Sequence, residues 1–86
     1  MTTLLITHEV DDVQHWLASP RREELFGPLG YTFRTFVDPA KTNRTGLIVE
    51  VPSLEAFQEL MESEATGDAM KFDGVHPDTV QILVES

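Results

Sequence analysis

Hydrophobic and polar positions follow six separate patterns along the chain, and each pattern predicts one element. Alternation with a period of two residues predicts a strand, whereas apolar positions spaced three or four residues apart predict a helix. The alternating runs cover residues 3–10, 31–37, 45–51 and 79–85. The helical patterns cover residues 11–26 and 53–72. The predicted order is therefore strand, helix, strand, strand, helix, strand.

The two helical regions differ in how they begin and whether they are interrupted. Asp11 or Asp12 can cap the first region, and Ser19-Pro20 interrupts it, because proline fixes φ and lacks the amide donor. The chain either kinks at this point or starts a new helix. The second region is predicted to begin after the cap Ser53 and to extend to Phe72, weakened near its end by Gly67.

This order of elements predicts an α+β, ferredoxin-like fold. Two helical regions would cover one face of a four-stranded antiparallel sheet, with the strand order 4-1-3-2 and the first strand in the middle. A chain of 86 residues forms one domain, residues 1–86. In this topology the end of the first strand, the 38–44 hairpin and the start of the fourth strand meet at one end. His8, Asp73 and His76 are expected at that end.

The charge of the chain excludes several classes of partner. The formal net charge is −9, and nine acidic residues but only one lysine follow residue 44. Such a surface repels nucleic-acid phosphates and anionic membranes. The absence of cysteine excludes disulfides, thiolate nucleophiles and thiolate metal sites. Without a signal-like N-terminus or an apolar run long enough for a membrane helix, we expect a soluble cytoplasmic protein.

His8 is the leading candidate for chemistry. Strand alternation places it near the rim of the face that the helices cover. An imidazole there could act as a general base, oriented by a carboxylate such as Asp73. The alternative is a half-buried histidine with a structural hydrogen bond. His76 precedes a proline in a loop and is either a ligand at the pocket rim or a solvated turn residue.

Large apolar side chains offer the walls of a ligand pocket between the sheet and the helices. The candidates for substrate binding, besides His76, are Trp16, Phe33, Phe57 and Met70. The same residues would equally serve as an ordinary core. A metal site formed by His8, His76 and Asp73 is chemically possible, but no close histidine spacing supports it. We therefore predict no metal and no cofactor.

The other face of the sheet predicts an association between two copies of the chain. Leu5, Phe36, Ile48 and Leu83 alternate onto this face, beside Arg34 and Glu50. A solvated face rarely carries four large apolar residues, whereas the interface of a symmetric dimer does. We expect a homodimer through the open sheet face.

Two stretches carry a resemblance to a known superfamily. These are the strand-to-helix stretch GLIVEVPSLEAF, from Gly46 to Phe57, and the segment from His8 to Trp16 that leads into the first helix. Together with the order of elements, they resemble the dimeric α/β-barrel superfamily, which includes antibiotic biosynthesis monooxygenase-like small proteins. The resemblance covers nearly the whole chain and rests on pattern rather than on a catalytic signature.

The resemblance implies a barrel formed by the joined sheets of two ferredoxin-like subunits, each with a pocket between sheet and helices. Some members oxidise phenolic or polyketide substrates with dioxygen and no cofactor, and others degrade haem or isomerise lactones. The second helical region lacks a histidine to ligate haem iron. A pairing of His8 with Asp73 would be similar to the pair proposed for small single-domain members.

Three functions remain open at this point. The first is binding of a small, flat, mostly apolar molecule, with cofactor-independent monooxygenase-like catalysis by His8 and Asp73. The second is a non-catalytic dimeric module that binds a ligand or a partner protein. The third is a metal-dependent lyase or isomerase. The sequence specifies neither the substrate nor the reaction.

Overall fold

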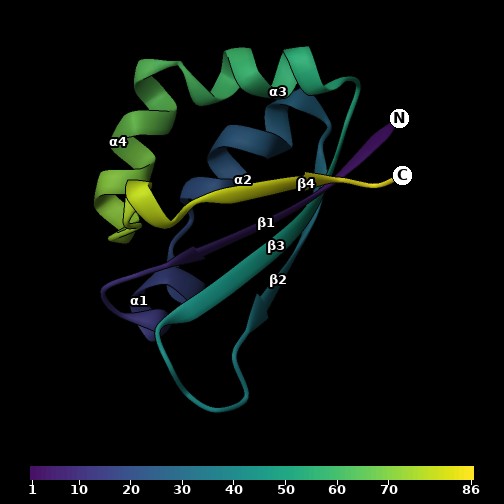
Figure 1. The fold of residues 1–86 in the computed structure, drawn as a ribbon. Helices are drawn as coiled ribbons and strands as arrows, with labels where there is room; N and C mark the ends of the chain where they lie inside the picture. The colour runs from purple at the N-terminus through teal and green to yellow at the C-terminus, as the bar shows by residue number, and fades with distance from the viewer.

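The computed structural model describes residues 1–86 and contains one antiparallel sheet of four strands. The strands are β1 (Thr2–Glu9), β2 (Thr32–Val37), β3 (Arg44–Val51) and β4 (Gln81–Val84). Their order is β2-β3-β1-β4, so β1 and β3 lie in the middle (Figure 1). The predicted strand order and the α+β, ferredoxin-like architecture are confirmed.

Four helices and two short 3-10 helices connect the strands. They are α1 (Val13–Ala18), α2 (Arg21–Phe26), η1 (Gly27–Leu29), α3 (Leu54–Met61), α4 (Glu64–Asp73) and η2 (Pro77–Thr79). Trp16 and Phe57 from the helices pack with Leu4 and Val49 from the sheet into the buried core. The helices therefore cover one face of the sheet and leave the other open. None of them has the length and apolar character needed to cross a lipid bilayer.

The first helical region is two helices, because the chain restarts at Ser19-Pro20. Asp12 caps α1, and its carboxylate accepts a hydrogen bond from the amide of Gln14 at 2.9 Å. Ser19 Oγ accepts a hydrogen bond from the amide of Arg21, the first residue of α2, at 3.1 Å. Of the two predicted outcomes at the proline, the structure shows the restart.

The prediction of one helical region without a break over residues 53–72 is wrong. Helix α3 ends at Met61, and Ser63 caps α4 by accepting a hydrogen bond from the amide of Thr66. Serine competes in this way for backbone groups and favours a helix start over a helix interior. The chain turns sharply at the break (Figure 1). Gly67 lies inside α4, and Gly74, with a φ of 73°, ends that helix.

The open face of the sheet carries a row of side chains that are paired in register. Arg34 on β2 lies opposite Ile48 on β3, which lies opposite Leu5 on β1, which lies opposite Leu83 on β4. Leu83 is 60% exposed and Leu5 is 38% exposed. Three neighbouring apolar residues thus cross the open face from β3 to the edge strand.

Candidate functional site

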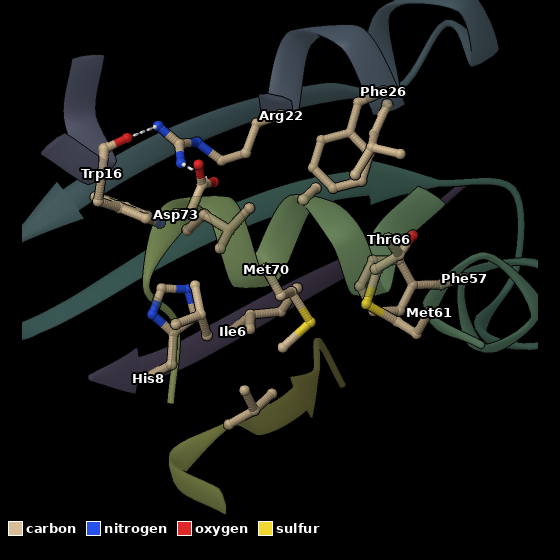
Figure 2. Close-up of a pocket in the computed structure, with 15 residues that line it drawn as sticks. Ile6, His8, Trp16, Arg22, Phe26, Phe57, Met61, Thr66, Met70 and Asp73 are labelled. Carbon is tan, nitrogen blue, oxygen red and sulfur yellow. Dashed lines mark hydrogen bonds and ion pairs between the residues drawn. The ribbon is translucent and has the colours of Figure 1, made fainter. Parts of the chain in front are cut away.

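A mostly apolar cavity of about 80 Å³ lies between the sheet and the helices. Eleven of its fifteen lining residues are hydrophobic. The polar exceptions are His8 from β1, Arg22 from α2, and Thr66 and Asp73 from α4. Figure 2 shows these side chains around the space beside Ile6 and Met70. An apolar hollow with a few converging polar groups is the usual form of a small-molecule site.

Most of the residues proposed from the sequence gather at this cavity. His8, Trp16, Phe57, Met70 and Asp73 line it.

The two other candidates lie elsewhere. The ring of Phe33 packs 5.5 Å from the ring of Phe26, between β2 and α2, and does not line the cavity. His76 does not line it either, and its Nε2 lies 2.5 Å from a carboxylate oxygen of Asp11 near the surface. The strand alternation gave the correct face for Phe33 but could not show that other side chains separate it from the cavity.

His8 is held at the end of β1 by a hydrogen bond across the sheet. Its side chain is directed toward the cavity, and the residue is only 8% exposed. The hydroxyl oxygen of Thr45 lies 2.7 Å from His8 Nδ1 and 3.2 Å from the His8 carbonyl oxygen. Both contacts are hydrogen bonds at once when the hydroxyl donates to the carbonyl and accepts from Nδ1–H. We therefore assign the proton to Nδ1, which leaves the Nε2 lone pair free.

The surroundings of His8 favour its uncharged form. Burial lowers the pKa of His8 below its ordinary value, and the nearby Arg22 cation lowers this pKa further. Asp73 raises the pKa, but its effect is smaller. The edge of the imidazole packs against Trp16, with the ring centres 5.5 Å apart. A neutral imidazole facing an apolar space can accept a proton from a bound molecule.

The predicted pairing of His8 with Asp73 requires a hydrogen bond between the two side chains. The structure does not contain this bond. The Oδ2 atom of Asp73 instead lies 3.3 Å from Nη1 of Arg22. Arg22 also donates from Nη2 to the carbonyl oxygen of Trp16 at 2.6 Å, and its guanidinium lies 4.2 Å from the centre of the Trp16 ring. The carboxylate therefore orients Arg22, and Thr45 orients His8.

The buried ion pair is incompletely hydrogen-bonded within the protein. Arg22 Nε and Asp73 Oδ1 are fully enclosed, and no group of the chain reaches either atom. The two side chains are 10% and 5% exposed. Enclosing a polar atom without a partner costs about 1–3 kcal/mol, so such atoms are uncommon in folded proteins.

Sequence reasoning missed Arg22 and Thr45. Arg22, Leu25 and Phe26 have the spacing of one helix face, so the arginine occupies a position in an apolar stripe, which signals burial. Nothing in the sequence pattern around Thr45 indicated that its side chain is buried or contacts His8. Thr45 lies opposite His8 only because of the β1–β3 register, which the sequence pattern does not specify.

The three residues of the chemically possible metal site do not come together. His8, Asp73 and His76 each have a different partner, namely Thr45, Arg22 and Asp11. No group of three or more histidine, cysteine, aspartate or glutamate residues lies close enough to hold a metal ion. The alternative of a metal-dependent lyase or isomerase therefore has no ligand set in this fold.

Solved structures with the same fold are found at low sequence identity. A crystal structure of an antibiotic biosynthesis monooxygenase has a TM-score of 0.67 and 13% identity, and the match covers 100% of this chain and 97% of that one. A putative antibiotic biosynthesis monooxygenase from Deinococcus radiodurans has a TM-score of 0.57 and 12% identity, with coverages of 100% and 91%.

A protein from Arabidopsis thaliana has a TM-score of 0.60 and 11% identity, with coverages of 100% and 94%. No protein-family model and no curated protein sequence matches the chain. At these identities the likeness concerns the fold, and the resemblance inferred from the sequence is confirmed at that level. The chain has the ferredoxin-like α+β fold found in antibiotic biosynthesis monooxygenase-like proteins.

Proposed function

We propose that this chain binds a small, flat, mostly apolar molecule in the sheet–helix cavity and that His8 accepts a proton from it. The observation that carries the proposal is the position of the His8 imidazole on the wall of an apolar space, where burial lowers the pKa of His8. Thr45 fixes the orientation of this imidazole. His8 is the proton acceptor, and Trp16, Phe57 and Met70 form walls around the ligand.

The size of the cavity restricts the ligand and implies some movement of the walls. An engineered apolar cavity of about 150 Å³ binds benzene. The cavity here has about half that volume. Met61 and Met70 both line it, and methionine side chains are long and flexible enough to move aside. A flat ring would therefore enter by displacing one or both of these side chains.

The similar solved structures named as monooxygenases suggest a reaction that follows proton transfer to His8. A substrate with an acidic methylene group would lose a proton to Nε2 and become a carbanion. The carbanion would donate electrons to dioxygen and form a hydroperoxide at that carbon. Loss of water then gives a ketone, with one oxygen atom in the product and the other in water. This sequence balances without a cofactor or an external reductant.

A dimer through the open sheet face is part of the proposal. The row formed by Ile48, Leu5 and Leu83 supports it, because neighbouring exposed apolar residues on a sheet face are typical of an interface. Phe36 on β2 is 45% exposed and adds to the same face.

The second candidate function is a dimeric module that binds a ligand without converting it. The small volume of the cavity favours this alternative, because a reaction with dioxygen needs room for both reactants. The two candidates share the binding step and differ only in the role of His8.

The binding step can be tested with methyl-labelled methionine and NMR. The chain has three methionines, of which Met61 and Met70 line the cavity, while Met1 is 87% exposed and serves as an internal control. On titration with toluene, we expect saturable shifts of the Met61 and Met70 methyl signals and no shift of the Met1 signal. If only non-saturable changes are seen, or if all three signals shift alike, the cavity does not bind such a ligand.

The role of His8 can be tested by oxygen uptake with a panel of flat compounds that carry an acidic methylene group. A compound consumed by the native protein should be consumed at least about 100-fold more slowly by His8→Gln, the usual size of a general-base effect. His15→Gln on α1 is the matched control and should retain full activity. Equal turnover by His8→Gln and the native protein would remove the proposed mechanism.

A further inference from the structure

A continuous series of side-chain contacts connects the buried ion pair to the imidazole of His8. The series begins at Asp73 on α4, whose carboxylate lies 3.3 Å from the Arg22 guanidinium on α2. That guanidinium donates to the carbonyl oxygen of Trp16 at 2.6 Å and lies 4.2 Å from the centre of the Trp16 ring. The Trp16 and His8 rings stand at 81° to each other, with their centres 5.5 Å apart (Figure 2).

Arg22 holds Trp16 at a place where the local helices are too short to do so. Helices α1 and α2 have six residues each, and isolated helices of this length are not stable in water. Arg22 is 8% exposed and Trp16 is 1% exposed, so their contact is shielded from water. A cation over an indole ring stabilises more strongly in such a shielded place than at the surface. Arg22 therefore fixes Trp16 by its backbone and its ring together.

The same arginine dominates the charges around His8. The charged groups that act on the imidazole are Arg22 from α2 and Asp73 from α4, whereas its contacts Thr45 and Trp16 are uncharged. After burial, the Arg22 cation contributes most to lowering the pKa of His8, and Asp73 opposes it by less. A protonated imidazole beside this cation returns its proton readily, which suits a base that starts each turnover uncharged.

We infer that Arg22 is a positioning residue for His8: Asp73 holds Arg22 in place, and Arg22 fixes the Trp16 ring against which the imidazole packs. The inference deepens the proposed function and rests on it, because a positioned base matters only if His8 takes a proton from the ligand. Thr45 then holds the imidazole from the sheet, and Trp16 holds it from the helical layer. Arg22 acts through these contacts and needs none with the ligand.

The protonation of His8 can be followed by fluorescence, because Trp16 is the only tryptophan of the chain. A protonated imidazole quenches a neighbouring indole, so the emission should fall on acidification with the midpoint of His8. His8→Gln should lack this step, which assigns it. In the double variant Arg22→Met with Asp73→Leu, the midpoint should move to higher pH, because the effect of Arg22 on the pKa exceeds that of Asp73. An unchanged or lower midpoint would overturn the inference.

The position of the imidazole needs a second measurement, the nuclear Overhauser effect between the ring protons of His8 and Trp16. Apolar replacement of a buried ion pair commonly preserves folding, and the double variant should lose this effect. Arg22→Lys keeps a cation beside Asp73 but lacks the planar fork that reaches the carboxylate and the Trp16 carbonyl together. It should also lose the ring contact while keeping the low His8 midpoint, and it decides the question alone if the double variant does not fold. A native-like effect in Arg22→Lys would overturn the inference.

The matched control is Arg21→Met with Glu24→Leu, which removes an exposed ion pair from the same helix. It should leave both the fluorescence midpoint and the ring contact as in the native protein. Changes as large as those in the Arg22 variants would show a general loosening of α2 and would overturn the specific role. Neither measurement needs a ligand, so a failed toluene titration would refute the proposed function separately from the role of Arg22.

Discussion

The hydroxyl oxygen of Thr45 lies 2.7 Å from Nδ1 of His8, across the pairing of β3 with β1. This contact connects the fold to the proposed chemistry. The register of the two central strands brings the threonine opposite the histidine, and the threonine directs the free lone pair of Nε2 away from itself. The pairing of β1 with β3 therefore sets the orientation of the His8 imidazole.

Replacing Thr45 with valine tests the strength of this contact. Valine has nearly the same shape but leaves His8 Nδ1 and the His8 carbonyl oxygen without the hydroxyl. We expect the free energy of unfolding to fall by about 1–2 kcal/mol, the cost of a buried hydrogen bond whose partner is left unsatisfied. Urea denaturation measures the change. The exposed Thr35 on β2 gives the control Thr35→Val, which should change stability by less than about 0.5 kcal/mol.

The buried ion pair predicts a non-additive effect on stability. Arg22→Met alone leaves the Asp73 carboxylate buried without its cation and should destabilise the protein by about 3–5 kcal/mol. The double variant Arg22→Met with Asp73→Leu removes both charges and should be much closer to the native stability. Urea denaturation of the two single variants and the double variant completes the cycle. Additive losses would show that the two side chains act independently.

Acid should weaken the fold through His8. Because its pKa is lowered by burial and by Arg22, the folded state disfavours the charged imidazole. The unfolded chain then binds the proton first as the pH falls below about 6.5, so stability is lost from there down through the folded pKa. Stability measured by urea unfolding at pH 7, 6 and 5 should fall less steeply in His8→Gln than in the native protein. Parallel curves would contradict the lowered pKa.

His76 should behave in the opposite way. Its hydrogen bond with Asp11 raises the pKa of His76, so the charged pair is favoured at low pH and is lost as the pH rises through this raised value. NMR titration of the imidazole should give a midpoint above the ordinary value of about 6.5. Asp11→Asn should bring the midpoint back down, and an unchanged midpoint would argue against the pairing.

The proposed dimer can be disrupted at its apolar row. Leu83→Glu places a charge beside Leu5 on the open face and, by symmetry, against the second subunit. Sedimentation velocity should show the native protein as a dimer and this variant as a monomer. Leu17→Glu on α1 introduces the same charge at a residue that is 40% exposed in the helical layer, and this variant should remain a dimer. A monomeric native protein would refute the dimer.

The fold was largely predictable because local patterns and connectivity restrict it strongly. The alternation in residues 3–10 and 45–51 marked two central strands, and the helical spacing around Trp16 and Phe57 marked the covered face. The break at Ser63 was missed because a serine within a helical pattern can either lie inside one helix or cap the start of a second helix. Leu17 lies next to the buried Trp16 in the helical pattern of residues 11–26, yet its side chain is exposed, because a six-residue helix buries only a narrow face.

The candidate site was less predictable, because it depends on partners brought together from distant elements. Strand alternation correctly placed His8 on the cavity wall, and topology placed Asp73 nearby. The sequence pattern could not show that Arg22 forms an ion pair with Asp73, nor that Thr45 forms a hydrogen bond with His8. Such choices between possible partners depend on side-chain geometry within the packed structure.

The tautomer of His8 is the most direct test of the proposed base. A nitrogen-15 NMR spectrum of the imidazoles at pH 7 distinguishes a protonated ring nitrogen from one with a free lone pair. The structure predicts that His8 carries its proton on Nδ1 and that Nε2 is unprotonated. A His8 signal from the Nε2–H tautomer, or from the doubly protonated ring, would contradict the central claim that an uncharged base faces the cavity.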